Sequence, residues 1–158
     1  MCFITDWITP SSGIIVVNEP SVIEVFDKYI QDDELKHEAG GILLGYRRGQ
    51  HFQIVHATEP TKYDKRSRHH FERSPEIHAD IAIGMWRKSY GHITYCGEWH
   101  THPVIHPSPS PLDRKEWKVL STKLPRNKSY VMTIVGIGQL WSGVAHYDGS
   151  LTELAPVK

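Results

Sequence analysis

The sequence predicts a mixed α/β domain, built around a central sheet that contains both parallel and antiparallel strands. Short apolar runs typical of buried strands alternate with segments of helical periodicity over the first two-thirds of the chain. Two further strand-like runs follow, on either side of Gly138. A chain of 158 residues fits one domain that buries a sizeable core. We therefore expect a single domain over residues 1–158, with its core at about 13–147.

The first strand and the first helix are indicated by a change of periodicity. Residues 13–17 (GIIVV) form a short apolar run, which predicts a buried strand. Pro20 then begins a segment with apolar residues at helical spacing, which predicts a helix over about 20–34. The apolar positions of this helix are Val22, Ile23, Phe26 and Ile30.

A hairpin and a long polar segment come next. The apolar runs at 41–46 (GILLGY) and 52–57 (FQIVHA) are joined by a short turn that contains glycine, a pattern typical of a β-hairpin. Residues 59–73 are polar, charged and without periodicity, so we expect a long exposed loop there. Long loops in compact domains usually serve a function or move.

The second predicted helix has clear start signals. Ser74 is typical of an N-cap, Pro75 suits the first helical position, and Glu76 places an acidic residue in the first turn. The apolar face expected to pack on the sheet comprises Ile77, Ile81, Ala82, Met85 and Trp86.

The last third of the chain contains a strand, a proline-rich loop, a helix and a hairpin. Residues 93–100 (ITYCGEWH) predict a strand, and four prolines in 103–111 require an extended loop. A helix follows from Ser110 or Pro111. The two final strands are predicted at 130–137 and 140–147.

Composition and charge exclude several classes of function. Lys plus Arg and Asp plus Glu each number 18, so the formal net charge is zero. A nucleic-acid-binding domain normally carries a positive excess, and so does a protein that binds an anionic membrane. The N-terminus does not resemble a signal peptide, and Cys2 and Cys96 form no disulfide framework. We expect a cytoplasmic protein that binds neither nucleic acid nor membrane.

The HTHP segment at 100–103 carries the strongest chemical signal. Alternate residues of a strand face the same side, so His100 and His102 bring two imidazoles together at the end of a strand. With 11 histidines in the chain, such a pair alone is a weak indication of a metal. Asp113 follows His102 by eleven positions and offers a third ligand. The three residues together predict a metal site.

The predicted ligand set favours a catalytic zinc ion. Structural zinc sites use four ligands, mostly cysteine, whereas catalytic sites use three and leave one position open for water. Other divalent metals also accept imidazole and carboxylate ligands. A catalytic metal lowers the pKa of water to about 7, which makes a nucleophile available at neutral pH. We therefore expect about one Zn²⁺ per chain, bound by His100, His102 and Asp113.

Ser110 has two compatible interpretations. The sequence SPLD at 110–113 is typical of a helix N-terminus, with serine as N-cap, proline first and an acidic residue third. The hydroxyl of Ser110 can also take part in chemistry. A capped helix start is a rigid support for both an Asp113 ligand and a neighbouring hydroxyl.

Hydrolysis also needs a general base, and two glutamates are candidates. Glu98 lies on the same strand face as His100 but one step further back. Glu38 leads into the glycine-rich strand EAGGILLG, at a core edge where a carboxylate can be desolvated. The residues alone do not decide between them.

The combined motif resembles the JAMM/MPN metalloproteases, the zinc isopeptidases that include eukaryotic deubiquitinases. The family pattern of a Glu, then His-x-His-Pro, seven residues and Ser-x-x-Asp is present here without a change in spacing. The resemblance implies Glu38 as general acid and base and Ser110 as a donor to the oxyanion. It also implies zinc on the three predicted ligands and a three-layer α-β-α fold of the cytidine-deaminase-like type.

A narrower resemblance is to the small JAMM peptidases of CBASS anti-phage operons. The features that indicate it are the chain length, the GEW segment before the histidines, the PSPS run and Trp117. It implies a partner with an extended C-terminal tail, a cGAS/DncV-like nucleotidyltransferase that the enzyme releases from conjugates. Two alternatives remain open. The chain could be a generic bacterial JAMM peptidase that processes a ubiquitin-like or sulfur-carrier protein, or a metal-free MPN binding scaffold.

Overall fold

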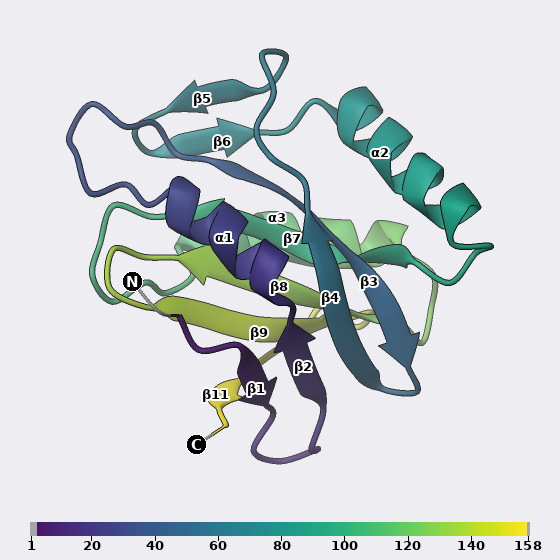
Figure 1. Ribbon diagram of the computed structural model, residues 1–158. Coiled ribbons are helices and arrows are strands. Elements are labelled where there is room, and N and C mark those ends of the chain that lie inside the picture. Colours follow the sequence, from purple (N-terminus) through teal and green to yellow (C-terminus); the bar gives the residue numbers. More distant parts are fainter. Residues whose placement is uncertain (1–2, 158) are drawn as a thin grey trace.

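The computed structural model describes residues 3–157, so that Cys2 lies outside the described residues (Figure 1). Three helices and eleven strands are assigned within this range. In chain order they are β1 (Asp6–Ile8), β2 (Ile15–Asn18), α1 (Pro20–Lys28), β3 (Gly40–Arg48), β4 (His51–Ala57), β5 (Lys65–Ser67), β6 (His70–Glu72), α2 (Pro75–Lys88), β7 (Thr94–Thr101), α3 (Pro111–Lys123), β8 (Ser129–Val135), β9 (Leu140–His146), β10 (Leu151–Glu153) and β11 (Ala155–Pro156).

Nine of these strands form one mixed sheet, in the order β10-β9-β8-β7-β3-β4-β2-β1-β11. Within it β2–β4 and β7–β8 run parallel, and the other neighbours run antiparallel. The parallel pair β7–β8 is connected through α3, as a parallel pair requires a crossover. The predicted mixed α/β class is confirmed.

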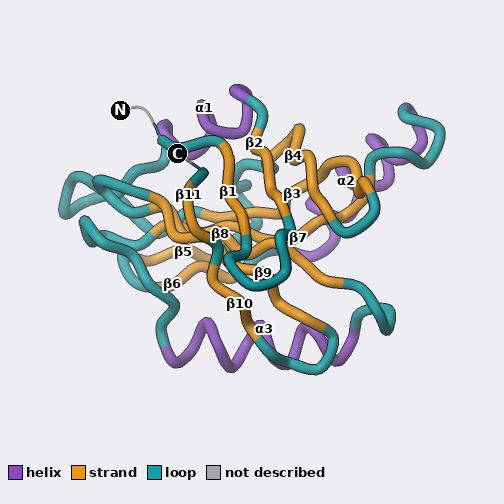
Figure 2. The backbone as a smooth tube through the Cα atoms, turned by 90° about the horizontal axis from the view of Figure 1, so that it is seen from below, coloured by secondary structure: helices purple, strands orange, loops and turns teal. Residues whose placement is uncertain are grey.

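Helices cover both faces of this sheet, with α1 on one side and α3 on the other (Figure 2). The alternation of side chains along β8 explains how both faces are buried. Val131 and Val135 join the core cluster that contains Phe26 of α1, whereas Met132 joins the cluster that contains Trp117 of α3. No helix within residues 3–157 has both the length and the apolar character that a membrane crossing needs.

The first helix is shorter than predicted, because it ends at Lys28 rather than near residue 34. Ile30 is buried as its spacing indicated, but it lies beyond the helix. Gln31 follows in this loop, and its side chain turns into the interior, where its amide pairs with Lys36, Arg68 and Thr101. The sheet also extends beyond residues 13–147, because its short outer strands begin at Asp6 and end at Pro156.

The prediction of a loop over 59–73 was wrong for its second half, where β5 and β6 form a hairpin. Each strand has three residues, and only the middle residue of each is partly buried. Such short strands leave no periodicity to detect. Asp64 closes the base of the hairpin by accepting hydrogen bonds from the backbone N–H groups of Thr61 (2.6 Å) and Ser74 (2.7 Å). The segment is therefore anchored rather than free.

The second helix begins at Pro75 as predicted, but it packs differently. Its predicted apolar face is only partly buried, and Trp86 is 51% exposed. His78 is the buried residue of α2, because both of its ring nitrogens have partners. One nitrogen lies 2.6 Å from the hydroxyl of Thr58 and the other 3.2 Å from Asp64. Burying an imidazole costs little free energy when both of its nitrogens have hydrogen-bond partners. The periodicity of apolar residues does not reveal such a position.

Candidate active site

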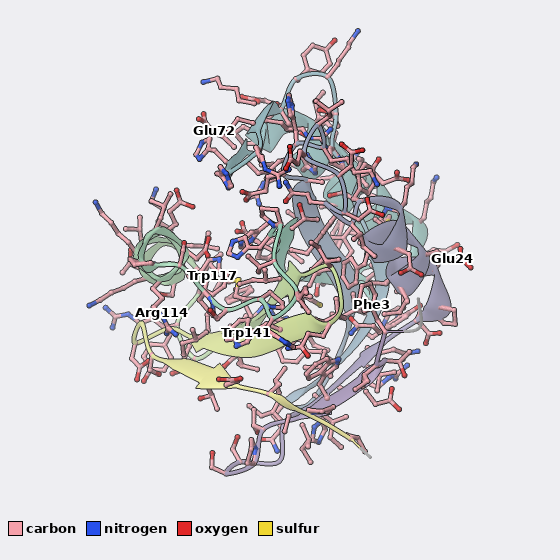
Figure 3. All side chains as sticks on the ribbon, turned by 90° about the vertical axis from the view of Figure 1, so that its left-hand side faces the viewer. Phe3, Glu24, Glu72, Arg114, Trp117 and Trp141 are labelled. Carbon is pink, nitrogen blue, oxygen red and sulfur yellow. The ribbon has the colours of Figure 1, made fainter. Side chains whose placement is uncertain are left out.

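Strand β7 and helix α3 deliver the predicted metal ligands to one end of the sheet. His100 lies near the end of β7, and His102 follows directly after it. Because β7 and β8 are parallel and α3 connects them, the N-terminus of α3 lies at the carboxyl end of β7. Asp113 is the third residue of α3. Figure 3 looks along α3, with Trp117 pointing from the helix toward Trp141 and the sheet.

The three predicted ligands converge within bonding range of a single ion. The Nε2 atoms of His100 and His102 are 3.0 Å apart. The carboxylate of Asp113 lies 3.2 Å from Nε2 of His100 and 3.4 Å from Nε2 of His102. Ligand atoms of a tetrahedral zinc ion, with bonds of 2.0–2.1 Å, are about 3.3 Å apart. The donor set therefore fits a tetrahedral metal with one open position.

The start of α3 holds Asp113 in place. The hydroxyl of Ser110 accepts from the Asp113 N–H at 3.1 Å, and the Asp113 carboxylate accepts from the Ser110 N–H at 2.7 Å. Together they form a capping box. Burial alone would raise the pKa of Asp113, but the contacts with His100 and His102 hold that pKa well below its usual range. The carboxylate is thus ionised and fixed in direction, as a ligand must be.

Glu38 lies beside the two histidines, at the start of β3. The antiparallel register pairs Gly40 with His100, and continuing it by two residues brings Glu38 beside His102. Its carboxylate and the two imidazoles lie within 4.8 Å of one another. Glu38 is only 7% exposed, and this burial raises its pKa, although the two histidines act in the opposite direction.

Proximity alone would allow Glu38 instead of Asp113 as the third ligand. The short contacts favour Asp113, because its carboxylate oxygens lie 3.2 Å and 3.4 Å from the two imidazole nitrogens, close to the spacing of ligand atoms around one ion. Burial raises the pKa of Glu38, which is the direction that makes a carboxylate a better proton acceptor.

The second candidate base, Glu98, is engaged elsewhere. Its carboxylate forms an ion pair with Arg73 at 2.5 Å and accepts a hydrogen bond from the Tyr95 hydroxyl at 3.3 Å. These two contacts hold the Glu98 carboxylate, whereas the Glu38 carboxylate lies within 4.8 Å of both imidazoles. The structure therefore favours Glu38. Arg73 was not singled out from the sequence, because nothing in a charged loop indicates which residue turns inward.

A cavity of about 850 Å³ connects these groups to the surface. The β5–β6 hairpin and α3 form its walls, and it contains Glu38 and the three predicted ligands. His69 and His70 are exposed and line this cavity, whereas His106 is exposed and does not line it. The lining residues that the sequence did not indicate include Phe71, Leu112 and Glu116.

Cys96 lies on β7 but takes no part in the candidate site. Its side chain is fully buried, and burial raises the pKa of the thiol to about 11. A nucleophilic cysteine needs the opposite shift. Cys96 is therefore a thiol of the hydrophobic core.

Ser110 provides a first test of the site, because its Oγ accepts from Asp113 and its own hydrogen has no acceptor among residues 3–157. Ser110→Ala should lower kcat by roughly 10²–10³-fold, the usual effect of removing one oxyanion donor. Loss of the N-cap should also cost about 1 kcal/mol of unfolding free energy. Steady-state kinetics and thermal melting measure the two effects separately.

Ser74→Ala is the matched control, since Ser74 is the N-cap residue of α2 and makes no capping bond. We expect it to leave kcat unchanged. A Ser110→Ala enzyme with wild-type kcat and a lower melting temperature would show that Ser110 is only a helix cap.

Comparison with known proteins gives consistent matches over most of the chain. Residues 25–144 match the family model described as prokaryotic homologs of the JAB domain. A Pseudomonas aeruginosa protein named CD-NTase/cGAS isopeptidase is 39% identical over the full length of both chains. Proteins of the same name from Escherichia coli and Vibrio cholerae are 35% and 34% identical, and the alignments cover 90% and 84% of this chain and 86% and 83% of theirs.

A solved structure supports the fold alone. The solution structure of protein DSY2949 from Desulfitobacterium hafniense superimposes with a TM-score of 0.62 at 20% sequence identity. The superposition covers 87% of this chain and 88% of that one. At this identity the likeness shows a shared architecture.

Proposed function

Because the chain belongs to the family of prokaryotic JAB-domain homologues, we propose that it is a zinc-dependent isopeptidase that cleaves an amide bond at the C-terminus of a conjugated protein. The observation that carries this proposal is the convergence of His100, His102 and Asp113 beside the buried Glu38 in an open cavity. The names of the relatives support the peptidase class.

Each group has a role that its surroundings suit. His100, His102 and Asp113 would hold the metal ion. When bound, the ion supplies Lewis acidity, which polarises the scissile carbonyl and activates water. Glu38 accepts the proton of the attacking water and returns it to the leaving amine, for which its raised pKa is appropriate. The Ser110 hydroxyl donates to the carbonyl oxygen as negative charge develops there.

For the substrate we propose a nucleotidyltransferase of the CD-NTase/cGAS type, because the three relatives carry that name. Its C-terminal tail would lie extended in the cavity between the β5–β6 hairpin and α3. An extended peptide binds through its main chain and presents alternate side chains to pockets. An extended tail would place its last residues in this cavity, so these residues should carry much of the specificity.

A fusion substrate tests this assignment. The cognate nucleotidyltransferase is joined through its C-terminus to a reporter protein, and cleavage is followed by gel and mass spectrometry. We expect a cut at the junction, and no cut when the terminal residues are scrambled. Equal cleavage of a ubiquitin fusion would refute the specific substrate and favour a generic JAMM peptidase, while the zinc chemistry would stand.

A further inference from the structure

Gln31 is a buried polar residue with no role in the chemistry described so far. It lies just beyond α1, and its side chain is only 1% exposed. Its amide oxygen accepts from the Thr101 hydroxyl at 2.7 Å, and its Nε2 donates to the carbonyl oxygens of Arg68 (2.9 Å) and Lys36 (3.2 Å). Both polar ends of this side chain are paired, the oxygen with β7 and the nitrogen with the β5–β6 hairpin and the loop before β3. Gln31 therefore joins β7 to the β5–β6 hairpin through its side chain.

One partner of Gln31 lies between the two predicted metal ligands. Thr101 separates His100 from His102, and strand alternation turns its side chain to the opposite face of the sheet. The Thr101 hydroxyl accepts from the Ala39 N–H at 2.9 Å, and the Thr101 N–H donates to the Ala39 carbonyl at 2.8 Å. Ala39 immediately follows Glu38. The hydroxyl that Gln31 orients thus holds the backbone beside the proposed base.

The other partner, Arg68, lies at the turn of the β5–β6 hairpin. Two neighbouring residues of this hairpin hold the backbone of Glu38 directly. The Glu38 N–H donates to the Ser67 carbonyl at 2.7 Å, and Nε of Arg66 donates to the Glu38 carbonyl at 2.8 Å. Arg66 belongs to the segment that was expected to form an exposed loop, but this contact turns its side chain toward the site. The β5–β6 hairpin and β7 therefore hold the Glu38–Ala39 peptide from two sides. Gln31 forms hydrogen bonds with both the hairpin and β7.

We propose that Gln31 is a positioning residue, whose amide fixes the hairpin against the metal-ligand strand and so sets the location of the Glu38 carboxylate. The inference rests on the proposed function, because it assigns a role in placing the general base. A displacement of about 1 Å in a reacting group can lower a rate 10²-fold, so the link is expected to affect kcat. The hairpin is then a fixed part of the catalytic site and not a lid that closes on the substrate.

The test compares Gln31→Met, which keeps the shape and removes all three hydrogen bonds, with the wild-type enzyme. We expect kcat to fall by between about 10- and 100-fold, with KM within about threefold of wild type. Zinc content should be unchanged, and the Glu38 amide hydrogen should exchange faster with solvent. The matched control is Gln53→Met, because Gln53 also bonds two side chains, those of Glu19 and Arg48, but far from the site. The Gln53→Met variant should retain the wild-type kcat and the wild-type exchange rate of the Glu38 amide hydrogen.

Variants of Thr101, the partner of Gln31, separate a role in positioning Glu38 from a role in the stability of the fold alone. Thr101→Val removes the hydroxyl and should reproduce the effect of Gln31→Met, whereas Thr101→Ser keeps the hydroxyl and should restore kcat. If both act through one link, the double variant Gln31→Met/Thr101→Val should fall little below the worse single variant. A purely structural role would lower only the melting temperature.

The outcomes distinguish the two proposals. Wild-type kcat and wild-type Glu38 exchange in Gln31→Met would overturn the positioning role, even if the enzyme is a zinc isopeptidase. A wild-type protein that cleaves no fusion would overturn the proposed function, while amide exchange would still report whether Gln31 holds Glu38. Should Gln31→Met fail to fold, the Thr101 pair of variants decides the matter.

Discussion

Glu38→Gln is expected to lower kcat by about 10²–10⁴-fold, the usual contribution of a general base. The change keeps the size of the side chain and removes its ability to accept a proton. Because Glu38 is buried and its pKa is raised, an amide replaces it without losing an ion pair, so the fold should be preserved. Single-turnover kinetics on the fusion substrate measure the effect, and circular dichroism and zinc analysis check the fold and the metal.

Two further glutamate variants make this result specific. Glu24→Gln, on the exposed surface of α1, should behave as wild type (Figure 3). Glu98→Gln should weaken the contact with Arg73 and have a smaller effect than Glu38→Gln. An inactive Glu98→Gln enzyme together with an active Glu38→Gln enzyme would show that the base has been assigned to the wrong residue.

The double variant His100→Ala/His102→Ala is expected to lose zinc and all detectable hydrolysis. It removes two of the three proposed ligands and both imidazoles, so the three-ligand set that a catalytic zinc ion needs is lost. Purified wild-type protein should contain about one zinc ion per chain by elemental analysis. Added zinc should also raise the melting temperature of the metal-free wild type, since a ligand that binds the folded state stabilises it, and should leave that of the variant unchanged.

His106→Ala is the control for this experiment, because His106 is exposed and lies outside the cavity lining. It should keep both zinc and activity. Full zinc occupancy in the double variant would refute the ligand assignment. A wild-type protein that binds no zinc would favour the metal-free scaffold, the alternative from another functional class.

The elements that the sequence predicted well are those whose signal is local. Buried strands such as β3 and β8 show apolar runs, and the start of α3 shows a capping pattern that the structure contains in full. The short strands β1, β10 and β11 were missed, because strands of two or three residues are held by backbone pairing and need no apolar pattern. The end of α1 was misplaced because the apolar spacing continues to the buried Ile30, which lies beyond the last helical residue.

For this protein the sequence by itself determined the fold class and the set of candidate residues, because periodicity and motif spacing are local properties of the chain. It left Glu38 and Glu98 undecided on physical grounds, and only the family resemblance separated them. The tertiary structure supplied the physical reason: Arg73, from a segment with no readable pattern, pairs with Glu98, while burial beside the histidines raises the pKa of Glu38. Charge pairing and desolvation depend on which segments meet in space, and that information is not contained in the spacing of residues along the chain.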